Sequence, residues 1–193
     1  MKQFIIAILL STAALASAQI DTDHLKVGET APLIAGVDQT GKRIDSKTIL
    51  EDQKILLLFY RGNWCPYCKK HLKLLSENLE ALAEKGYYVV VVTPEKVEKT
   101  QETAQLVDAG YSIIHDTDNK IMEAYKVAFE VNDKNVTSYY GFTKKKVAKY
   151  NAENNNVLPV PATYIIGQDG AISYVHYDPD YSKRASLEEI LAL

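Results

Sequence analysis

The sequence predicts an α/β fold in which a central mixed β-sheet is covered by helices on both faces. Two observations carry this prediction. Continuous apolar runs suited to buried strands alternate with stretches in which apolar residues recur at helical spacing. Near the C-terminus, two strand-like runs flank the turn signal Gln168-Asp169-Gly170, which indicates a hairpin and therefore an antiparallel pair.

The first buried strand is predicted at residues 55–60, which are apolar or aromatic without interruption. The helix after it should begin next to Cys65, because Pro66 suits the first helical turn, and Gly86 should end it. One face of this helix carries an apolar stripe made of Cys68, Leu72, Leu75, Leu79 and Leu82. This strand and helix therefore place a cysteine pair at a strand-to-helix junction.

The remaining elements continue the alternation. Strands are expected at residues 88–92, 111–115, 162–166 and 171–177, and helices at 96–109, 118–126 and 187–193. Asp118 is the predicted N-cap of its helix. The segment 129–156 is additional to a minimal fold, and its aromatic and lysine residues read as a solvated helix face.

Residues 1–18 are predicted to be a signal peptide, which leaves 19–193 as a single domain. Lys2 gives the positive start, residues 4–10 the apolar run, and Ala16-Ser17-Ala18 an A-x-A cleavage site. The apolar run is short for a bilayer span, so a retained anchor is the weaker alternative. We expect an exported, most simply periplasmic, protein that does not associate with a membrane once the signal is removed.

The net charge of the chain argues against one class of binding partner. The chain has 22 Lys and Arg against 25 Asp and Glu, a formal net charge of −3. It therefore lacks the cationic excess that holds nucleic acid through counterion release, and we expect no nucleic-acid partner.

Cys65 and Cys68 are the chain's two cysteines, and three kinds of site would use such a pair. A structural zinc site needs four ligands, and only His71 lies near the pair, so we expect no metal. A structural disulfide closing so short a loop would add little stability to a domain of this size. A redox-active dithiol is the favoured interpretation.

The flanking residues suggest a role for each sulfur. Cys65 is predicted at a helix N-terminus, where free N–H groups and the helix dipole stabilise a thiolate, and Cys68 should be more buried. Such asymmetry lets one thiol attack and the other resolve the mixed disulfide. Arg61 is a candidate for stabilising a thiolate or sulfenate, and Trp64 for shielding the sulfur.

Several segments, in this order, resemble the peroxiredoxin-like proteins of the alkyl hydroperoxide reductase/thiol-specific antioxidant (AhpC/TSA) family, within the thioredoxin-fold superfamily. They are VGETAP at 27–32, GK at 41–42, FYRGNWCPYC at 59–68, LPVPATYII at 158–166, DG at 169–170, and YDPDY at 177–181 with Arg184. The resemblance implies a thioredoxin-like fold. It also implies an antioxidant thiol oxidoreductase that cycles between a Cys65/Cys68 dithiol and its disulfide.

The resemblance further implies a peroxide or disulfide substrate and a dithiol electron donor of thioredoxin type, with no metal, nucleotide or flavin. Aligned with typical family members, Cys68 takes the place of the peroxide-attacking cysteine and Pro161 that of an arginine. A thioredoxin-like alignment instead makes Cys65 the attacking thiol and Pro161 a cis-proline that lines the sulfur. We hypothesise that an exposed, low-pKa Cys65 attacks disulfides, whereas peroxide reaches Cys68.

Three functions follow, in order of preference. The first is peroxide reduction, and the second is thiol–disulfide exchange with protein partners. The third is a non-catalytic binding domain that uses the cysteine pair as a structural disulfide, and the missing family arginine keeps it open. The substrate, the electron donor, the redox direction and the oligomeric state are not decided by the sequence.

Overall fold

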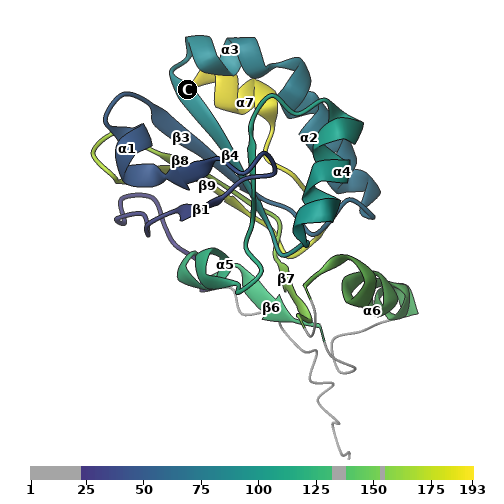
Figure 1. Cartoon of the computed structure of the whole chain (residues 1–193). Helices are drawn as coiled ribbons and strands as arrows, with labels where there is room; N and C mark the ends of the chain where they lie inside the picture. The colour runs from purple at the N-terminus through teal and green to yellow at the C-terminus, as the bar shows by residue number, and fades with distance from the viewer. Residues whose placement is uncertain (1–22, 132–137, 153–154) are drawn as a thin grey trace, which may run out of the picture.

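The structure, a computed structural model, describes residues 23–131, 138–152 and 155–193, without side-chain detail for 138–143. The predicted signal peptide lies outside the described residues. Figure 1 shows the arrangement of the elements. The strands are β1 (Ala35–Val37), β2 (Arg43–Asp45), β3 (Lys54–Phe59), β4 (Tyr87–Thr93), β5 (Ser112–His115), β6 (Ala128–Glu130), β7 (Val157–Pro159), β8 (Ala162–Ile166) and β9 (Ile172–Tyr177). The helices are α1 (Ser46–Leu50), α2 (Pro66–Glu77), α3 (Leu79–Glu84), α4 (Val97–Val107), α5 (Lys120–Ala124), α6 (Ser138–Tyr150) and α7 (Leu187–Ala192).

The central sheet has five strands in the order β5-β4-β3-β8-β9. Strands β3, β4 and β5 run parallel, whereas β8 pairs antiparallel with both β3 and β9. The predicted mixed sheet and its C-terminal hairpin are therefore confirmed. Two smaller pairs, β1-β2 and β6-β7, lie outside this sheet.

Helices cover both faces of the sheet, as predicted (Figure 1). Successive residues of β3 point to opposite faces, so its apolar run contributes to two separate core clusters. Leu56 and Leu58 join the cluster formed with α2, α3, α4 and α7. Leu57 and Phe59 join the cluster formed with α1 and α5. Burial on both faces explains why β3 has no polar alternation.

The helix predicted between Cys65 and Gly86 is divided in two at Asn78. Asn78 has φ −117° and ψ 15°, outside the helical region, and its side-chain amide donates to the Leu74 carbonyl at 2.9 Å. This local hydrogen bond competes with the continuing helix, as asparagine side chains commonly do. The apolar stripe still reaches the core on both sides of the break, since Leu75 and Leu82 are buried.

The predicted cap at Asp118 is wrong. The α5 helix begins after Asn119, and the carboxylate of Asp116 accepts hydrogen bonds from the backbone N–H groups of Ile121 (3.2 Å) and Met122 (2.9 Å). Asp116 is buried at the end of β5 and satisfies donors of the first helical turn, whereas Asp118 pairs with a neighbouring lysine instead.

The sheet topology determines where the cysteine motif lies. The parallel strands β3 and β4 end at the same edge of the sheet, and β8 begins at that edge because Ala162 pairs with Phe59. The segments after β3 and β4 and the one before β8 therefore meet there, at the edge where open α/β sheets place ligands. Among the helices described, none is long and apolar enough to cross a membrane.

Candidate active site

Both cysteines lie at the start of α2. Cys65 is the N-cap residue, Pro66 is in the first turn, and the Lys69 N–H donates to the Cys65 carbonyl at 3.1 Å, as the sequence pattern predicts. Both are free thiols, and both are buried, with exposed fractions of 2% for Cys65 and 1% for Cys68. The expectation of an exposed Cys65 is therefore wrong, because its side chain turns into the same core cluster as Cys68.

Three residues stabilise a thiolate at Cys68. Burial alone would raise the pKa of this thiol. The Cys65 thiol, the Arg184 guanidinium and the Arg61 backbone N–H oppose burial and lower the pKa of Cys68 to about 6. The Arg184 contact is direct, with Nη2 3.3 Å from the Cys68 sulfur. Charge-assisted hydrogen bonds of this kind are the strong ones in a low-dielectric site.

The pKa of Cys65 shifts in the opposite direction. Its thiol donates to the Cys68 sulfur and is itself buried, and both effects raise the pKa of Cys65. A shared hydrogen bond favours the charged form of the acceptor and the neutral form of the donor. The hypothesis of a low-pKa Cys65 is therefore wrong. The hydrogen bond that Cys65 donates, followed by the charge of Arg184, favours ionisation of Cys68 over ionisation of Cys65.

Arg61 and Trp64 lie together at this site. The Arg61 guanidinium is 5.2 Å from the centre of the Trp64 ring and 5.0 Å from that of Tyr181. Arg61 is only 2% exposed, so its charge acts without much screening by water, and it contributes to the lowered pKa of Cys68. Trp64 packs against the core cluster that contains both cysteines. Stacking between aromatic rings is a favourable setting for a buried guanidinium.

Glu95 holds the loop between β3 and α2. Its carboxylate accepts from the Tyr60 hydroxyl at 2.9 Å and from the Asn63 backbone N–H at 3.0 Å. Burial raises the pKa of Glu95 to about 7 against the effect of these bonds. Gly62, at φ +148°, lies between this carboxylate and Trp64, and a Cβ there would come within 2.4 Å of the Trp64 indole nitrogen. The close approach of Trp64 therefore leaves room only for a glycine at position 62.

Pro161 departs from the thioredoxin-like expectation. It is buried directly before β8, but its peptide bond is trans, since no cis bond occurs among the described residues. The trans form is favoured intrinsically by about 0.5–1 kcal/mol for bonds that precede proline. The neighbouring Val160 N–H reaches the Val127 carbonyl at 2.8 Å in this trans chain. The cis-proline prediction is therefore corrected.

Sequence reasoning assigned no site role to two residues of the site, Glu95 and Arg184, although Arg184 belongs to the segments that carry the family resemblance. Glu95 lies three residues after the predicted strand 88–92, which is parallel to the strand that precedes the cysteines, so strand order could have indicated it. Arg184 lies 116 residues from Cys68, in the segment between β9 and α7. Its Nη1 donates to the carbonyls of Tyr181 (2.6 Å) and Lys183 (2.5 Å), which orients the guanidinium. Only the folded topology brings it to the sulfur.

No group of three or more histidine, cysteine or acidic side chains in the described part of the chain could hold a metal ion. His71 lies one turn after Cys68 in α2, and burial, followed by the Arg184 charge, lowers the pKa of its imidazole to about 4. The groups gathered near the Cys68 sulfur are the Cys65 thiol, the guanidinium groups of Arg61 and Arg184, and the Glu95 carboxyl group.

Comparison with known proteins agrees with this picture. The Escherichia coli (strain K12) peroxiredoxin Bcp is 27% identical over 103 residues, which is 53% of this chain and 65% of the relative. The Bacillus subtilis thiol-disulfide oxidoreductase ResA is 25% identical over 107 residues, 55% of this chain and 59% of the relative. These matches span less than two thirds of either relative's length.

A solved structure extends the likeness. Peroxidoxin BcpB from Mycobacterium tuberculosis superposes with a TM-score of 0.66 at 18% identity, covering 88% of this chain and 96% of the other. The shared fold is thioredoxin-like, and peroxiredoxins are thiol peroxidases. Residues 27–175 match the AhpC/TSA family model. This range includes both cysteines and the central sheet, apart from the last two residues of β9. The chain therefore belongs to the AhpC/TSA family, as a peroxiredoxin-like protein with a thioredoxin-like fold.

Proposed function

We propose that this protein is a thiol peroxidase in which Cys68 attacks the peroxide and Cys65 resolves the product. One observation carries the proposal. The Cys68 sulfur receives hydrogen bonds from Cys65, Arg184 and the Arg61 backbone, which lower its pKa to about 6. Cys68 is therefore the sulfur that is ionised at neutral pH, and the thiolate is the nucleophile. Arg184 supplies a guanidinium although Pro161 occupies the family's arginine position.

The reaction balances with the groups present. The Cys68 thiolate attacks one peroxide oxygen, the O–O bond breaks, and the leaving oxygen takes a proton as water or an alcohol. Cys68 becomes a sulfenic acid. The Cys65 sulfur then attacks the sulfenic sulfur, and water leaves as the disulfide forms. A dithiol donor of thioredoxin type reduces this disulfide and completes the cycle. Arg61 and Arg184 stabilise negative charge on the sulfur and on the departing oxygen.

Burial favours peroxide over a protein disulfide as the oxidant. Cys65 is 2% exposed and Cys68 1%, so an oxidant of a few atoms can reach Cys68 with little rearrangement, whereas a second protein cannot. Thiol–disulfide exchange is the second candidate, because the Cys-x-x-Cys pair begins a helix and ResA is similar over part of the chain. Exchange with a protein would require the first turn of α2 to open.

Single-cysteine variants separate these functions. After hydrogen peroxide, Cys65→Ser should accumulate a sulfenic acid at Cys68, detected by mass spectrometry with a sulfenate-trapping reagent. Cys68→Ser should react no faster than an ordinary free thiol. With a protein disulfide as oxidant, rapid mixed-disulfide formation through Cys65 in Cys68→Ser, without any fast peroxide reaction in Cys65→Ser, would replace peroxidase by exchange.

We also propose that the protein is exported and works in the periplasm, which the Lys2 start, the apolar run 4–10 and the Ala16-Ser17-Ala18 site support. N-terminal sequencing of the protein from its native host should begin at or near Gln19. An intact Met1 species in the soluble cytoplasm would contradict export.

A further inference from the structure

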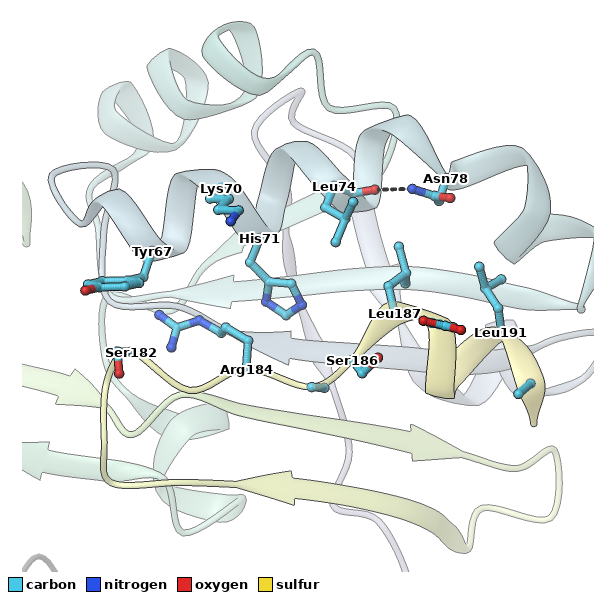
Figure 2. Close-up of a pocket in the computed structure, with 13 residues that line it drawn as sticks. Tyr67, Lys70, His71, Leu74, Asn78, Ser182, Arg184, Ser186, Leu187 and Leu191 are labelled. Carbon is cyan, nitrogen blue, oxygen red and sulfur yellow. Dashed lines mark hydrogen bonds between the residues drawn. The ribbon is translucent and has the colours of Figure 1, made fainter.

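A groove of about 920 Å³ lies between α2 and the C-terminal segment that ends in α7 (Figure 2). Its volume is within the range of small-molecule binding sites. Arg184 connects it to the cysteine site, because this residue both lines the groove and contacts the Cys68 sulfur at 3.3 Å. Cys68 itself is not part of the lining. The groove is therefore a separate site that shares one side chain with the redox centre.

The lining changes in character along the groove. Figure 2 shows Lys70, His71 and Arg184 towards one end, and Leu187 and Leu191 towards the other, where Asn78 also lies. Leu74 lies between α2 and the leucines of α7, and it is 40% exposed although it is large and apolar. Glu188, which follows Leu187 on α7, is the one carboxylate of the lining, and the lining also contains two cations, Lys70 and Arg184. An elongated ligand with an anionic head and an apolar tail complements this gradient.

His71 indicates that the polar end is built for a ligand. Its side chain is 5% exposed, and neither ring nitrogen has a hydrogen-bond partner among the described residues. Figure 2 shows the ring directed from α2 towards the segment that carries Arg184. Buried polar side chains are normally hydrogen-bonded, and a neutral imidazole offers one donor and one acceptor. Its pKa, lowered to about 4 by burial and by Arg184, keeps the ring neutral at working pH.

We propose that this groove binds an amphiphilic monocarboxylate, such as a medium-chain fatty acid, as a ligand that regulates the thiol site. The carboxylate accepts hydrogen bonds from Arg184, Lys70 and the His71 imidazole. The alkyl chain lies along Leu74, Leu187 and Leu191, which removes their apolar surface from water. The bound molecule is not the oxidant, and no bond to it forms or breaks.

The shared arginine couples the two sites. A carboxylate at Arg184 competes with the Cys68 thiolate for the same guanidinium and adds a negative charge nearby, so binding raises the pKa of Cys68. By linkage, a thiolate at Cys68 weakens carboxylate binding by the same factor. This coupling concerns the ionisation of Cys68, and only its effect on turnover rests on the proposed peroxidase function.

Calorimetric titration of the reduced full chain with decanoate tests the site, with decanol and acetate as matched probes that lack the anion or the tail. Decanoate should bind with one-to-one stoichiometry, and decanol at least tenfold more weakly. Lys70→Gln should weaken decanoate binding several-fold without affecting decanol. Leu74→Gln should weaken binding of both, whereas Leu106→Gln, a change of an exposed leucine on α4, should affect neither. Cys68→Ser, which has no thiolate, should bind decanoate about fivefold or more tightly than the parent protein.

The same titration can overturn the proposal. Absence of decanoate binding refutes it, and tighter binding of an acidic peptide would assign the groove to a protein partner. Equal affinities for decanoate and decanol refute the anionic head, and equal effects of Leu74→Gln and Leu106→Gln refute the groove. If decanoate binds but does not raise the alkylation midpoint of Cys68 by about one pH unit, the coupling through Arg184 is wrong. None of these binding and alkylation measurements depends on peroxidase activity, so a failure of the peroxidase proposal would be distinguished from a failure of this one.

Discussion

Replacing Arg184 by glutamine tests how Cys68 is activated. The substitution removes the charge 3.3 Å from the Cys68 sulfur and leaves a polar side chain of similar reach. A hydrogen bond to a charged group contributes about 1.5–3 kcal/mol, and one pKa unit corresponds to about 1.4 kcal/mol. Loss of the guanidinium should therefore raise the pKa of Cys68 by roughly one to two units from its value of about 6.

The assay is the pH dependence of alkylation by iodoacetamide, with the modified cysteine identified by mass spectrometry. The midpoint is a better measure than the rate at one pH, because a thiolate of higher pKa is intrinsically more nucleophilic and partly offsets its lower population. Arg184→Lys should give an intermediate midpoint, since it keeps the charge but not the planar donor pair. Lys183→Gln removes an exposed neighbouring cation and should leave the midpoint unchanged.

Two results would refute this reasoning. An unchanged midpoint in Arg184→Gln, with the fold intact by circular dichroism, would show that Cys65 and Arg61 are sufficient to lower the pKa of Cys68. Preferential alkylation of Cys65 near neutral pH would show that the wrong sulfur has been assigned as the thiolate.

Three further predictions concern stability and the loop. Glu95 has a folded-state pKa raised by burial from 4.5 to about 7, so its stabilising contribution is complete below about pH 4.5 and is lost as pH rises through 7. Glu95→Gln should remove about 3 kcal/mol of this pH dependence, measured by urea unfolding at pH 4.5 and 8, and a retained slope would contradict the assignment. Gly62→Ala should displace Trp64 and shift the alkylation midpoint of Cys68. Gly41, at φ +88°, has open space around it, so Gly41→Ala should lower stability without moving that midpoint. Equal midpoints in the two variants would show that the loop does not need a glycine at position 62. Asp116→Ala should lower the free energy of unfolding by about 1–2 kcal/mol through loss of the hydrogen bonds to the first turn of α5. Asp118→Ala should lower it much less. The reverse order would support Asp118 as the cap of this helix.

The elements that the sequence predicts well are those in which local pattern and burial agree. The uninterrupted apolar run of β3 can only be satisfied between two helical layers, and Pro66 marks the start of α2 within one residue. The helix break at Asn78 was missed because the apolar stripe continues across it. A single side-chain hydrogen bond to Leu74 decides the backbone there, and periodicity does not register such a bond.

The candidate site was predictable only in part. Cys65, Cys68, Arg61 and Trp64 are neighbours in the chain, so their proximity follows from the motif. Their relative acidity does not, because it depends on Arg184, which approaches from a segment 116 residues away. The helix-terminus argument favours the N-cap cysteine in isolation. It is overridden by the hydrogen bond that Cys65 donates to Cys68 and by the charge of Arg184.

The pairing of β3 with β8 also has a consequence for the order of folding. Strands β3, β4 and β5 are close in sequence, but β8 lies more than a hundred residues beyond β3, and such a contact forms late because loop closure must come first. During synthesis the cysteine segment emerges well before β8, β9 and Arg184. The contact between Arg184 and the Cys68 sulfur forms only after the segment that follows β9 has packed against α2, so the lowered pKa of Cys68 is acquired late in folding.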